Sequence, residues 1–471
     1  MRLSHRFSAS SVVFDDPNLV SAAGLVPVLG LAEAAGLSRL VGEHLRVPGD
    51  RGANPAAKVV SVLAGMGAGA DSIDDLALLR HGGMGRLFTG VRAPSTVGSF
   101  LRAFSFGNVS QLDAVASRFL TGLAARAPLL AGAELTYLDI DDTIRATYGH
   151  AKQGVEQGYS GVRGLNALLA TISTPLTAPV IAGARLRRGN VNSTRGAGQF
   201  LTRALRAANR AGLGAGVGAG VGAGALVVVR ADSAYYTHDV IAAARRGGAR
   251  FSVTARRNPA VLSAISGIDQ DAWTPIRYPQ AIWDPDQQRW ISDAEVAEVA
   301  FTAFTRRPRS EQVTGRLIVR RVRRLNPTSV PAGQQELFAT YRHHAVFTDS
   351  PLPMLQAEAA HRGHAVVEQV IADLKSGPLA HLPSGSFSAN SAWLILATMT
   401  FNLLRAAGTL ASTFHAKATT ATIRTQLINL PARLARSARR LRLHLPQHWP
   451  WQTAWENLLT TGCGPPPATT P

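Results

Sequence analysis

The chain of 471 residues contains a single cysteine, Cys463, and its first residues lack the pattern of a secretory leader. One cysteine excludes an intramolecular disulfide and any zinc site built from several cysteines. Because no apolar run is followed by a small-residue cleavage site, we expect no signal peptide. Together these absences predict a protein of the reducing cytoplasm.

Long uncharged apolar segments are also scarce. Residues 211–229 lack charge, but glycine interrupts them throughout, and residues 392–404 form a short segment that contains Asn402. A membrane-spanning helix needs about 20 consecutive apolar residues, so we expect no membrane association and a core helix around 392–404. The glycine-rich residues 212–225 lack the Lys-Ser/Thr ending of a phosphate-binding loop, and we expect a surface loop there.

Lysine is rare and acidic residues are few. The chain has 49 lysines and arginines, of which four are lysines, against 30 acidic residues, which gives a formal net charge of +19. Arginine has a planar side chain that suits phosphate oxygens, although a GC-rich genome also enriches arginine. Because the basic residues cluster along the chain, we favour binding to a polyanion such as a nucleic acid.

Composition changes along the chain, and its length also implies more than one structural unit. Apolar stretches broken by glycine and proline indicate helices in the first part, and β-like stretches begin near residue 133. The expected units are a helical N-terminal domain for DNA binding or dimerisation (1–130), the first part of an α/β core (131–254), a β-rich insertion (255–350), the rest of the core (351–385), a basic helical C-terminal region (386–460) and a disordered tail (461–471).

The central part of the sequence predicts a mixed α/β sheet. Three strands come first, followed by a helix, a strand, a helix and a last strand, which is the chain order of a ribonuclease-H-like core. The predicted fold class is therefore α/β, with a ribonuclease-H-like mixed-sheet core, a β-rich insertion and helical flanking regions. The strands are expected at 134–141, 165–173, 178–185, 225–231 and 250–254.

Three carboxylates occupy informative positions in this order. Asp141 and Asp232 each end an apolar strand, and Glu368 lies within a helix. Acids at strand ends and on a nearby helix can converge at a sheet edge, where they hold hard divalent cations such as Mg²⁺. On a strongly basic chain, such a site indicates phosphodiester chemistry on nucleic acid.

Each of these acids also has a simpler interpretation. Asp139 and Asp141 share one face of their strand, whereas Asp142 points away or begins the loop, and any of them can cap a turn. Asp232 can cap a helix, and Glu368 can lie on a solvated helix face. The order strand-Asp, strand-Asp, helix-Glu carries more weight than any single acid.

The helix around Glu368 carries further polar residues. His361, His364 and Glu368 are spaced to share one face, and Lys375 lies seven residues further on. A His/His/Glu transition-metal site and a plain polar face are both alternatives. We favour a helix that presents one metal ligand among donors that bind phosphate.

A basic segment follows near the C-terminus. Arg433 and Arg436 alternate with leucines in a pattern that predicts a basic amphipathic helix, which continues through Arg439 and Arg440. A membrane surface, a peptide-binding groove and the DNA backbone are all physically allowed partners, as is a solvated face. We favour DNA because the acids also indicate DNA chemistry.

Taken together, these residues resemble the DDE transposases of bacterial insertion sequences, a ribonuclease-H-like family, over about residues 130–445. Within that family the chain is similar to the branch numbered thirteen-eighty, which has a β-strand insertion and a Tyr-x2-Arg-x3-Glu-x6-Lys signature. His361 and His364 stand where that signature has Tyr and Arg. The matching blocks are Leu138-Asp-Ile-Asp-Asp-Thr143, Val229-Arg-Ala-Asp-Ser233 and His361 to Lys375.

The resemblance implies a transposase that cuts and joins double-stranded DNA at the terminal repeats of an insertion sequence, as a homodimer. It implies two Mg²⁺ ions, replaceable by Mn²⁺, held by Asp141, Asp232 and Glu368. Two alternatives are a transposase that has lost catalysis and acts as a DNA-binding repressor, and a nuclease of this fold that does not join strands. The side chains expected to contact DNA are His361, Arg362, His364, Lys375, Arg433, Arg436, Arg439 and Arg440.

Overall fold

The structure is a computed structural model of the chain. The residues that it describes are 12–130, 134–148, 151–158, 161–213, 225–278, 282–285, 288–291, 294–323, 341–437 and 440–464. Most of the glycine-rich loop expected at 212–225 lies outside these ranges, as do Arg439 and the end of the expected tail.

The first part of the chain is helical. Helix α3 begins at Pro55. Proline has no backbone N–H, but an N–H in the first turn of a helix has no intrahelical acceptor, so no hydrogen bond is lost at this position. Helix α6 begins with a capping box, in which Ser105 and Asn108 each accept a hydrogen bond from the backbone N–H of the other. The helices are α1 (Leu25–Ala34), α2 (Leu37–His44), α3 (Pro55–Ala68), α4 (Met84–Leu87), α5 (Pro94–Arg102) and α6 (Phe106–Ala124).

A mixed sheet lies at the centre of the molecule, with β2 (Leu135–Ala146) as its middle strand. Strand β2 pairs antiparallel with β4 (Arg163–Ser173) and parallel with β6 (Leu226–Ala231). Strand β5 (Val180–Arg188) pairs antiparallel with β4, and β7 (Arg250–Thr254) pairs parallel with β6. The five strands expected from the sequence are confirmed, in the spatial order β5–β4–β2–β6–β7.

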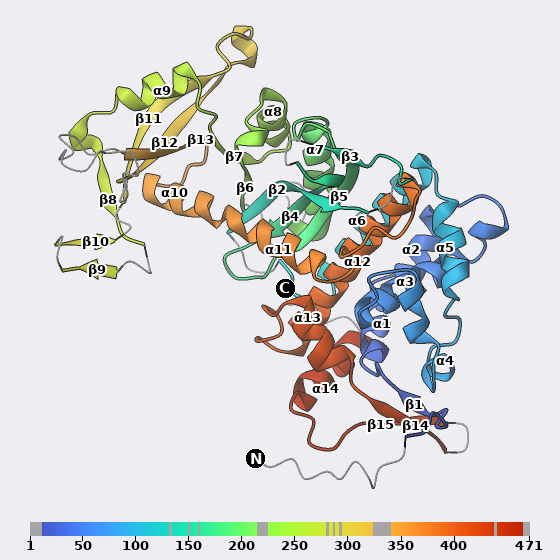
Figure 1. Ribbon diagram of the computed structural model, residues 1–471. Coiled ribbons are helices and arrows are strands. Elements are labelled where there is room, and N and C mark those ends of the chain that lie inside the picture. The colour runs from blue at the N-terminus through green and yellow to red at the C-terminus, as the bar shows by residue number, and fades with distance from the viewer. Residues whose placement is uncertain are drawn as a thin grey trace, which may run out of the picture.

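Helices cover this sheet on both sides. Helices α7 (Ala197–Ala208) and α8 (His238–Arg246) pack against each other and against the outer strands, whereas α11 (Val366–Lys375) packs against β2. Figure 1 shows α11, together with α10 (Met354–Arg362), crossing one side of the sheet while α7 and α8 lie on its other side. Residues on opposite sides of β2 therefore meet different helices.

The insertion between β7 and α10 continues the central sheet. Strand β13 (Tyr341–Thr348) pairs antiparallel with β7, and β12 (Val313–Arg323), β11 (Ala294–Ala303) and β8 (Thr274–Ile276) follow in that order. A β-rich segment was expected here, but its attachment to the sheet edge was not. The other elements of this segment are α9 (Pro259–Ser266), β9 (Ile282–Asp284) and β10 (Arg289–Ile291).

Helix α12 (Phe387–Ala411) lies between the central sheet and the N-terminal helices. It packs against β5 and against α3, α5 and α6 of the N-terminal part, and most of its side chains are buried. In the described part of the chain, α12 is the one helix long and apolar enough to cross a membrane, and the bent pair α1 and α2 passes that test only jointly. Because 89% of its most apolar stretch is buried inside the protein, the core helix expected at 392–404 is confirmed.

The helix expected around Arg433 is wrong. Two antiparallel strands, β14 (Ala432–Ser437) and β15 (Arg440–His444), occupy this segment, and β14 also pairs with β1 (Leu19–Val20). Ala432 and Leu434 are buried while Arg433 between them is exposed, which is the two-residue alternation of a strand. Helix α13 (Thr420–Ile423) precedes this hairpin and α14 (Gln452–Cys463) follows it.

Candidate active site

Asp141 and Asp232 lie just beyond the point where the parallel pairing of β2 with β6 ends, although β2 itself continues to Ala146 and not only to the expected residue 141. The last paired residues of β2 and β6 are Ile140 and Ala231, and each aspartate follows its strand's last pair directly. Parallel strands end at the same edge of a sheet, so the two carboxylates face a common space. Each carboxylate accepts a hydrogen bond from a nearby backbone N–H, that of Asp142 at 2.7 Å and that of Ala234 at 2.9 Å.

Within the described residues, neither Asp141 nor Asp232 forms an ion pair. Burial raises the pKa of Asp141 to about 6, and the nearby carboxylate of Asp232 adds to the rise, while the Asp142 N–H and His364 oppose it. The side chain of Asp232 is more exposed, but its partial removal from water still raises its pKa, against the same histidine. Their negative charge is therefore incompletely balanced by the protein.

Glu368 lies in the first turn of α11 with an exposed side chain. His364, four residues earlier, opposes the rise in the pKa of Asp141, and Asp141 in turn opposes the lowering of the pKa of Lys375, seven residues later. Since residues at these spacings share a helix face, the face of α11 that carries Glu368 is turned toward Asp141. No group of three His, Cys, Asp or Glu side chains in the described residues is close enough to hold a metal ion, so Glu368 is not gathered with the two aspartates.

Asp139, unlike Asp141 and Asp232, is paired with a basic side chain. Its side chain is fully buried and accepts two hydrogen bonds from the guanidinium of Arg230, at 2.7 and 2.8 Å. The Nδ1 atom of His364 lies 2.9 Å from the same carboxylate, and Arg230 also donates to the carbonyl oxygen of Ala360 in α10. Asp139 therefore fastens β2 to β6 and to the segment that carries His364.

Asp142 is likewise paired with a buried arginine. Arg187 of β5 donates to its carboxylate and also to Asn166 Oδ1 at 2.8 Å and to the carbonyl oxygen of Ser193 at 2.9 Å. This arrangement ties the end of β2 to the sheet edge on the side opposite α11. Asp142 is thus not available as an unpaired ligand.

The histidines of the expected phosphate grip are both occupied by protein partners. His361 lies 3.0 Å from the hydroxyl groups of both Ser252 and Thr254, and burial lowers its pKa to about 3. It is therefore neutral at physiological pH. His364 contacts Asp139, as described above, so neither histidine points freely to a ligand.

Arg362 and Lys375 differ in how strongly protein contacts hold their side chains. Arg362 donates to Glu358 Oε2 at 2.9 Å and lies over the ring of Tyr278, 5.0 Å from its centre. Lys375 is half-buried; burial and then Arg145 lower its pKa, and Asp141 opposes this. Lys375 is thus the expected phosphate contact that the structure places beside the acids.

Two functional neighbours were missed by reasoning from the sequence. The sequence indicates only that Arg230 belongs to a strand, whereas in the structure it pairs with Asp139, which also contacts His364. The hydroxyl of Tyr235 is buried without a hydrogen-bond partner in the described structure, and the charges of Asp142, Asp141 and Asp232 raise its pKa after burial itself. Arg230 and Tyr235 both lie within three positions of Asp232 in the sequence, and this proximity is the signal that could have identified them.

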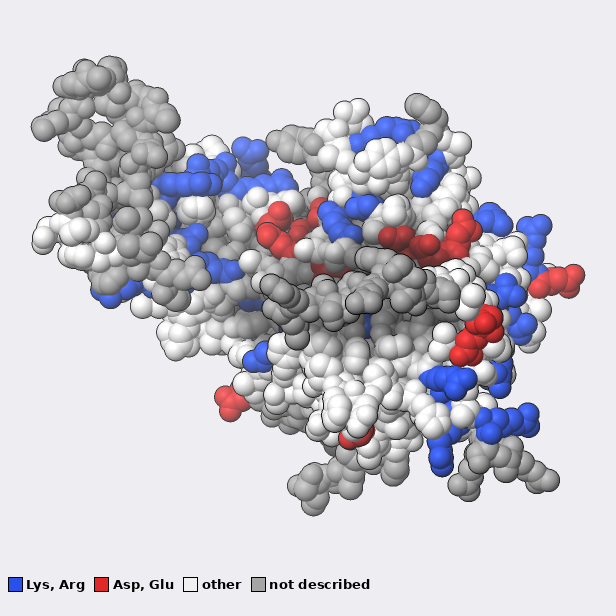
Figure 2. Space-filling view, turned by 60° about the horizontal axis from the view of Figure 1, so that its bottom comes forward, with Lys and Arg blue, Asp and Glu red and all other residues white. Residues whose placement is uncertain are grey.

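The expected DNA-binding arginines of the C-terminal region lie apart from the acids. Arg433 and Arg436 are exposed on β14, and Arg433 pairs with Asp16 at 3.3 Å. Arg440 belongs to β15, and Arg439 is outside the described residues. Figure 2 shows lysine and arginine side chains in several separate groups on one face, with acidic side chains between them.

The side chains around Asp141 fit a hard divalent cation. Two neighbouring carboxylates without arginine partners and a buried hydroxyl without a partner provide oxygen atoms of the type that Mg²⁺ prefers. Burial is the main cause of their raised pKa values, and a bound cation would supply positive charge that favours the ionised carboxylates. Arginine supplies that charge for Asp139 and Asp142 instead.

Comparison with known proteins gives one result for nearly the whole chain. The sequence model of a family described as "Transposase DDE domain group 1" matches residues 8–461. No curated protein matches the chain.

Proposed function

The chain belongs to the family described as transposase DDE domain, group 1, and on this premise we propose that it cuts and joins DNA at the ends of an insertion sequence. The observation that carries the proposal is the pair of adjacent aspartates, Asp141 and Asp232, that no basic side chain in the described residues neutralises by an ion pair. Phosphodiester chemistry needs a site that balances the charge of attacking and leaving oxygens.

The core of the proposed enzyme is ribonuclease-H-like. In support, the strand order is β5–β4–β2–β6–β7, with β4 antiparallel to the strand that carries Asp141. The helical N-terminal segment (1–130), the β-rich insertion (255–350) and the C-terminal segment (386–460) would surround this core as DNA-binding or dimerising units. The branch numbered thirteen-eighty is our proposal for the subfamily, since a β-rich segment precedes Glu368.

Asp141, Asp232 and Glu368 would hold the divalent cations, which we propose to be two Mg²⁺ ions that Mn²⁺ can replace. When bound, such ions activate the attacking oxygen and stabilise the leaving oxygen. Glu368 would have to approach the aspartates, and its exposed position on α11 leaves it free to turn. Helix α11 packs against β2, the strand that carries Asp141 (Figure 1).

The remaining side chains would position the DNA and the acids. Lys375, beside Asp141, would neutralise a phosphate next to the scissile bond. Asp139 and Arg230 would hold β2, β6 and the start of α11 in place. The exposed Arg433 and Arg436 would bind the DNA backbone without regard to sequence. We also propose that a homodimer acts on two DNA ends, in the cytoplasm.

A metal-swap experiment tests this proposal. The substrate is a duplex taken from the DNA that flanks the gene, and the readout is strand cleavage in Mg²⁺ or Mn²⁺. Asp232→Cys should be inactive with Mg²⁺ and partly active with Mn²⁺, because a thiolate is too soft for Mg²⁺. Asp74→Asn, which removes an exposed acid far from β2, is the matched control and should cleave normally.

The same experiment separates the alternatives. A protein that binds these ends but cleaves with neither metal would be a DNA-binding repressor, for which the engagement of His364 by Asp139 already gives a reason. Cleavage without strand joining would indicate a nuclease. Full Mg²⁺-dependent cleavage by Asp232→Cys would contradict the assignment of Asp232 to the metal.

A further inference from the structure

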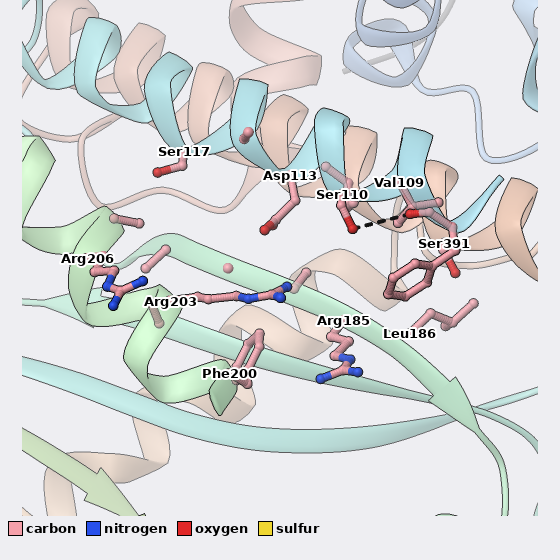
Figure 3. Close-up of a pocket in the computed structure, with 18 of the residues that line it drawn as sticks. Val109, Ser110, Asp113, Ser117, Arg185, Leu186, Phe200, Arg203, Arg206 and Ser391 are labelled. Carbon is pink, nitrogen blue, oxygen red and sulfur yellow. Dashed lines mark hydrogen bonds between the residues drawn. The ribbon is translucent and has the colours of Figure 1, made fainter. Parts of the chain in front are cut away.

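A basic pocket lies between α6, β5, α7 and the first turns of α12, away from the acids of the candidate active site. Its volume is about 390 Å³. Figure 3 shows its lining side chains, which come from elements far apart in the sequence. Its basic members are Arg118, Arg185, Arg203, Arg206 and Arg210, and Asp113 is the one carboxylate among the described residues that line it.

Two facing helices build the polar walls of this pocket. One face of α6 carries two serines and an aspartate at helical spacing, and the opposing face of α7 and the turn after it carries three arginines. In Figure 3, Asp113 points from α6 toward Arg203 on α7. The residues of the two faces are Ser110, Asp113 and Ser117, and Arg203, Arg206 and Arg210.

The pocket holds an excess of positive charge that the described residues do not pair. Within the described residues, none of its arginines forms an ion pair, and their hydrogen bonds there are Arg210 to Ser117 Oγ at 2.9 Å and Arg118 to a backbone carbonyl at 3.1 Å. Burial, followed by Arg203, lowers the pKa of Arg185. Burial raises the pKa of Asp113 despite three nearby arginines. An anion would relieve this repulsion, and the fork of a guanidinium suits phosphate.

The lining of the pocket includes aromatic side chains. Phe106 is 74% exposed, which is unusual for so large an apolar side chain, and it lines the pocket together with Phe387. Phe200 and Leu186 line the interior. A flat heterocycle can stack on such a ring, whereas an inorganic anion gains nothing from it.

We propose that this pocket binds a nucleotide, with its phosphates on the arginines of α7 and β5 and its base against Phe106. The volume lies within the usual range of small-ligand pockets, about 300–1,000 Å³. An unpaired nucleotide fits such a space and a duplex does not. The nucleotide is either free or the single-stranded end of a DNA strand. Binding requires neither Asp141 nor Asp232.

The test is a binding titration on the full chain by calorimetry, with a deoxynucleoside diphosphate and with inorganic pyrophosphate as probes. The double variant Arg203→Gln/Arg206→Gln should weaken both by about tenfold or more, since hydrogen bonds to charged groups are the stronger class. Asp113→Asn should tighten both. Phe106→Ala should weaken the nucleotide and leave pyrophosphate unchanged. The control Arg102→Gln removes an exposed guanidinium on α5, which donates a hydrogen bond to Ser99 of the same helix, and should have no effect.

A duplex with a single-stranded overhang identifies the source of the nucleotide. Stronger binding of the overhang than of the free nucleotide, lost in Arg203→Gln/Arg206→Gln, assigns the pocket to a DNA strand, and the reverse assigns it to a free nucleotide. Equal affinities of the double variant and Arg102→Gln for every probe would overturn the proposal, as would tighter binding of pyrophosphate than of nucleotide. Asp141→Asn should bind all probes normally, so a failure of the catalytic proposal leaves this result intact.

Discussion

Asp139 and Asp142 each lie beside a buried arginine, whereas Asp141 between them and Asp232 on the next strand have no such partner in the described residues. All four carboxylates lie within two residues of the last pair between β2 and β6, Ile140 and Ala231. The paired acids hold β2 to β6 and to β5, and the unpaired acids are left with raised pKa values.

The difference shows that acids in one short segment have two roles: the paired acids hold the strands together, and the unpaired acids remain open to a cation. A carboxylate that is fully buried needs a fixed positive partner, because an isolated charge in the interior is very unfavourable. A carboxylate that binds an exchangeable cation cannot also have a fixed positive partner. Asp139 and Asp141 share a face of β2, so their partners, and not their direction, distinguish them.

The largest effect is expected from removing the unpaired charges. Asp141→Asn and Asp232→Asn should each lower the cleavage rate by about a thousandfold or more, because a bound metal ion contributes several kcal/mol to the transition state. Binding of the DNA ends should persist, since it depends on distant arginines. Rates from a gel cleavage assay and affinities from a filter-binding assay measure the two effects separately.

Removing a paired charge should instead damage the fold. Asp139→Asn leaves Arg230 buried beside a neutral amide, and we expect the free energy of unfolding to fall by about 3 kcal/mol. Denaturant unfolding followed by circular dichroism measures this loss. An Asp139→Asn protein of normal stability that has lost metal binding would reverse the roles that we assign to Asp139 and Asp141.

Asp141→Asn should instead increase the free energy of unfolding in the same experiment. The pKa of Asp141 is raised in the folded protein, so the folded state binds this proton more tightly than the unfolded state. Its contribution to stability is therefore present below about pH 4 and is lost as the pH rises toward about 6. In metal-free buffer at pH 7, Asp141→Asn should be more stable than the wild type by about 3 kcal/mol, because each pKa unit of the rise from 3.8 to about 6 corresponds to about 1.4 kcal/mol. At pH 4 the two proteins should be equally stable.

The smallest effect is expected at the exposed arginines, which contrast with the buried Arg187 and Arg230. Replacing Arg433 and Arg436 by alanine should leave stability nearly unchanged and weaken binding to any DNA sequence. Each lost phosphate contact should reduce the slope of log affinity against log salt by about 0.9. An unchanged slope in a salt titration would exclude the β14–β15 hairpin from the DNA interface.

The sequence predicted the strands of the core because each is a short apolar run with a clear boundary. It predicted the neighbourhood of Asp141 and Asp232 for the same reason, since both acids end such runs and parallel strands end at one edge. The hairpin at Arg433 was read as a helix because arginines and leucines there fit both periods. The pairing of Leu19 with Arg433, across more than 400 residues, decided in favour of a strand.

The partners of the acids could not be read from the sequence. Arg230 reaches Asp139, and Arg187 reaches Asp142, only because β6 and β5 lie beside β2 and β4 in a particular register. His364 lies at the spacing of a phosphate contact, but the buried Asp139 holds it. Which charges are neutralised is a property of the folded arrangement, and local patterns do not contain it.

Calorimetric titration of the protein with Mn²⁺ measures most directly whether the unpaired acids hold a divalent cation, as we propose. We expect that the wild type and Asp74→Asn bind the metal, that Asp141→Asn and Asp232→Asn bind it at least about tenfold more weakly, and that Glu368→Gln also binds it more weakly. Affinity should also rise from pH 5 to pH 7, because the metal displaces the proton of Asp141. Equal Mn²⁺ affinity in the wild type, Asp141→Asn and Asp232→Asn would contradict the claim.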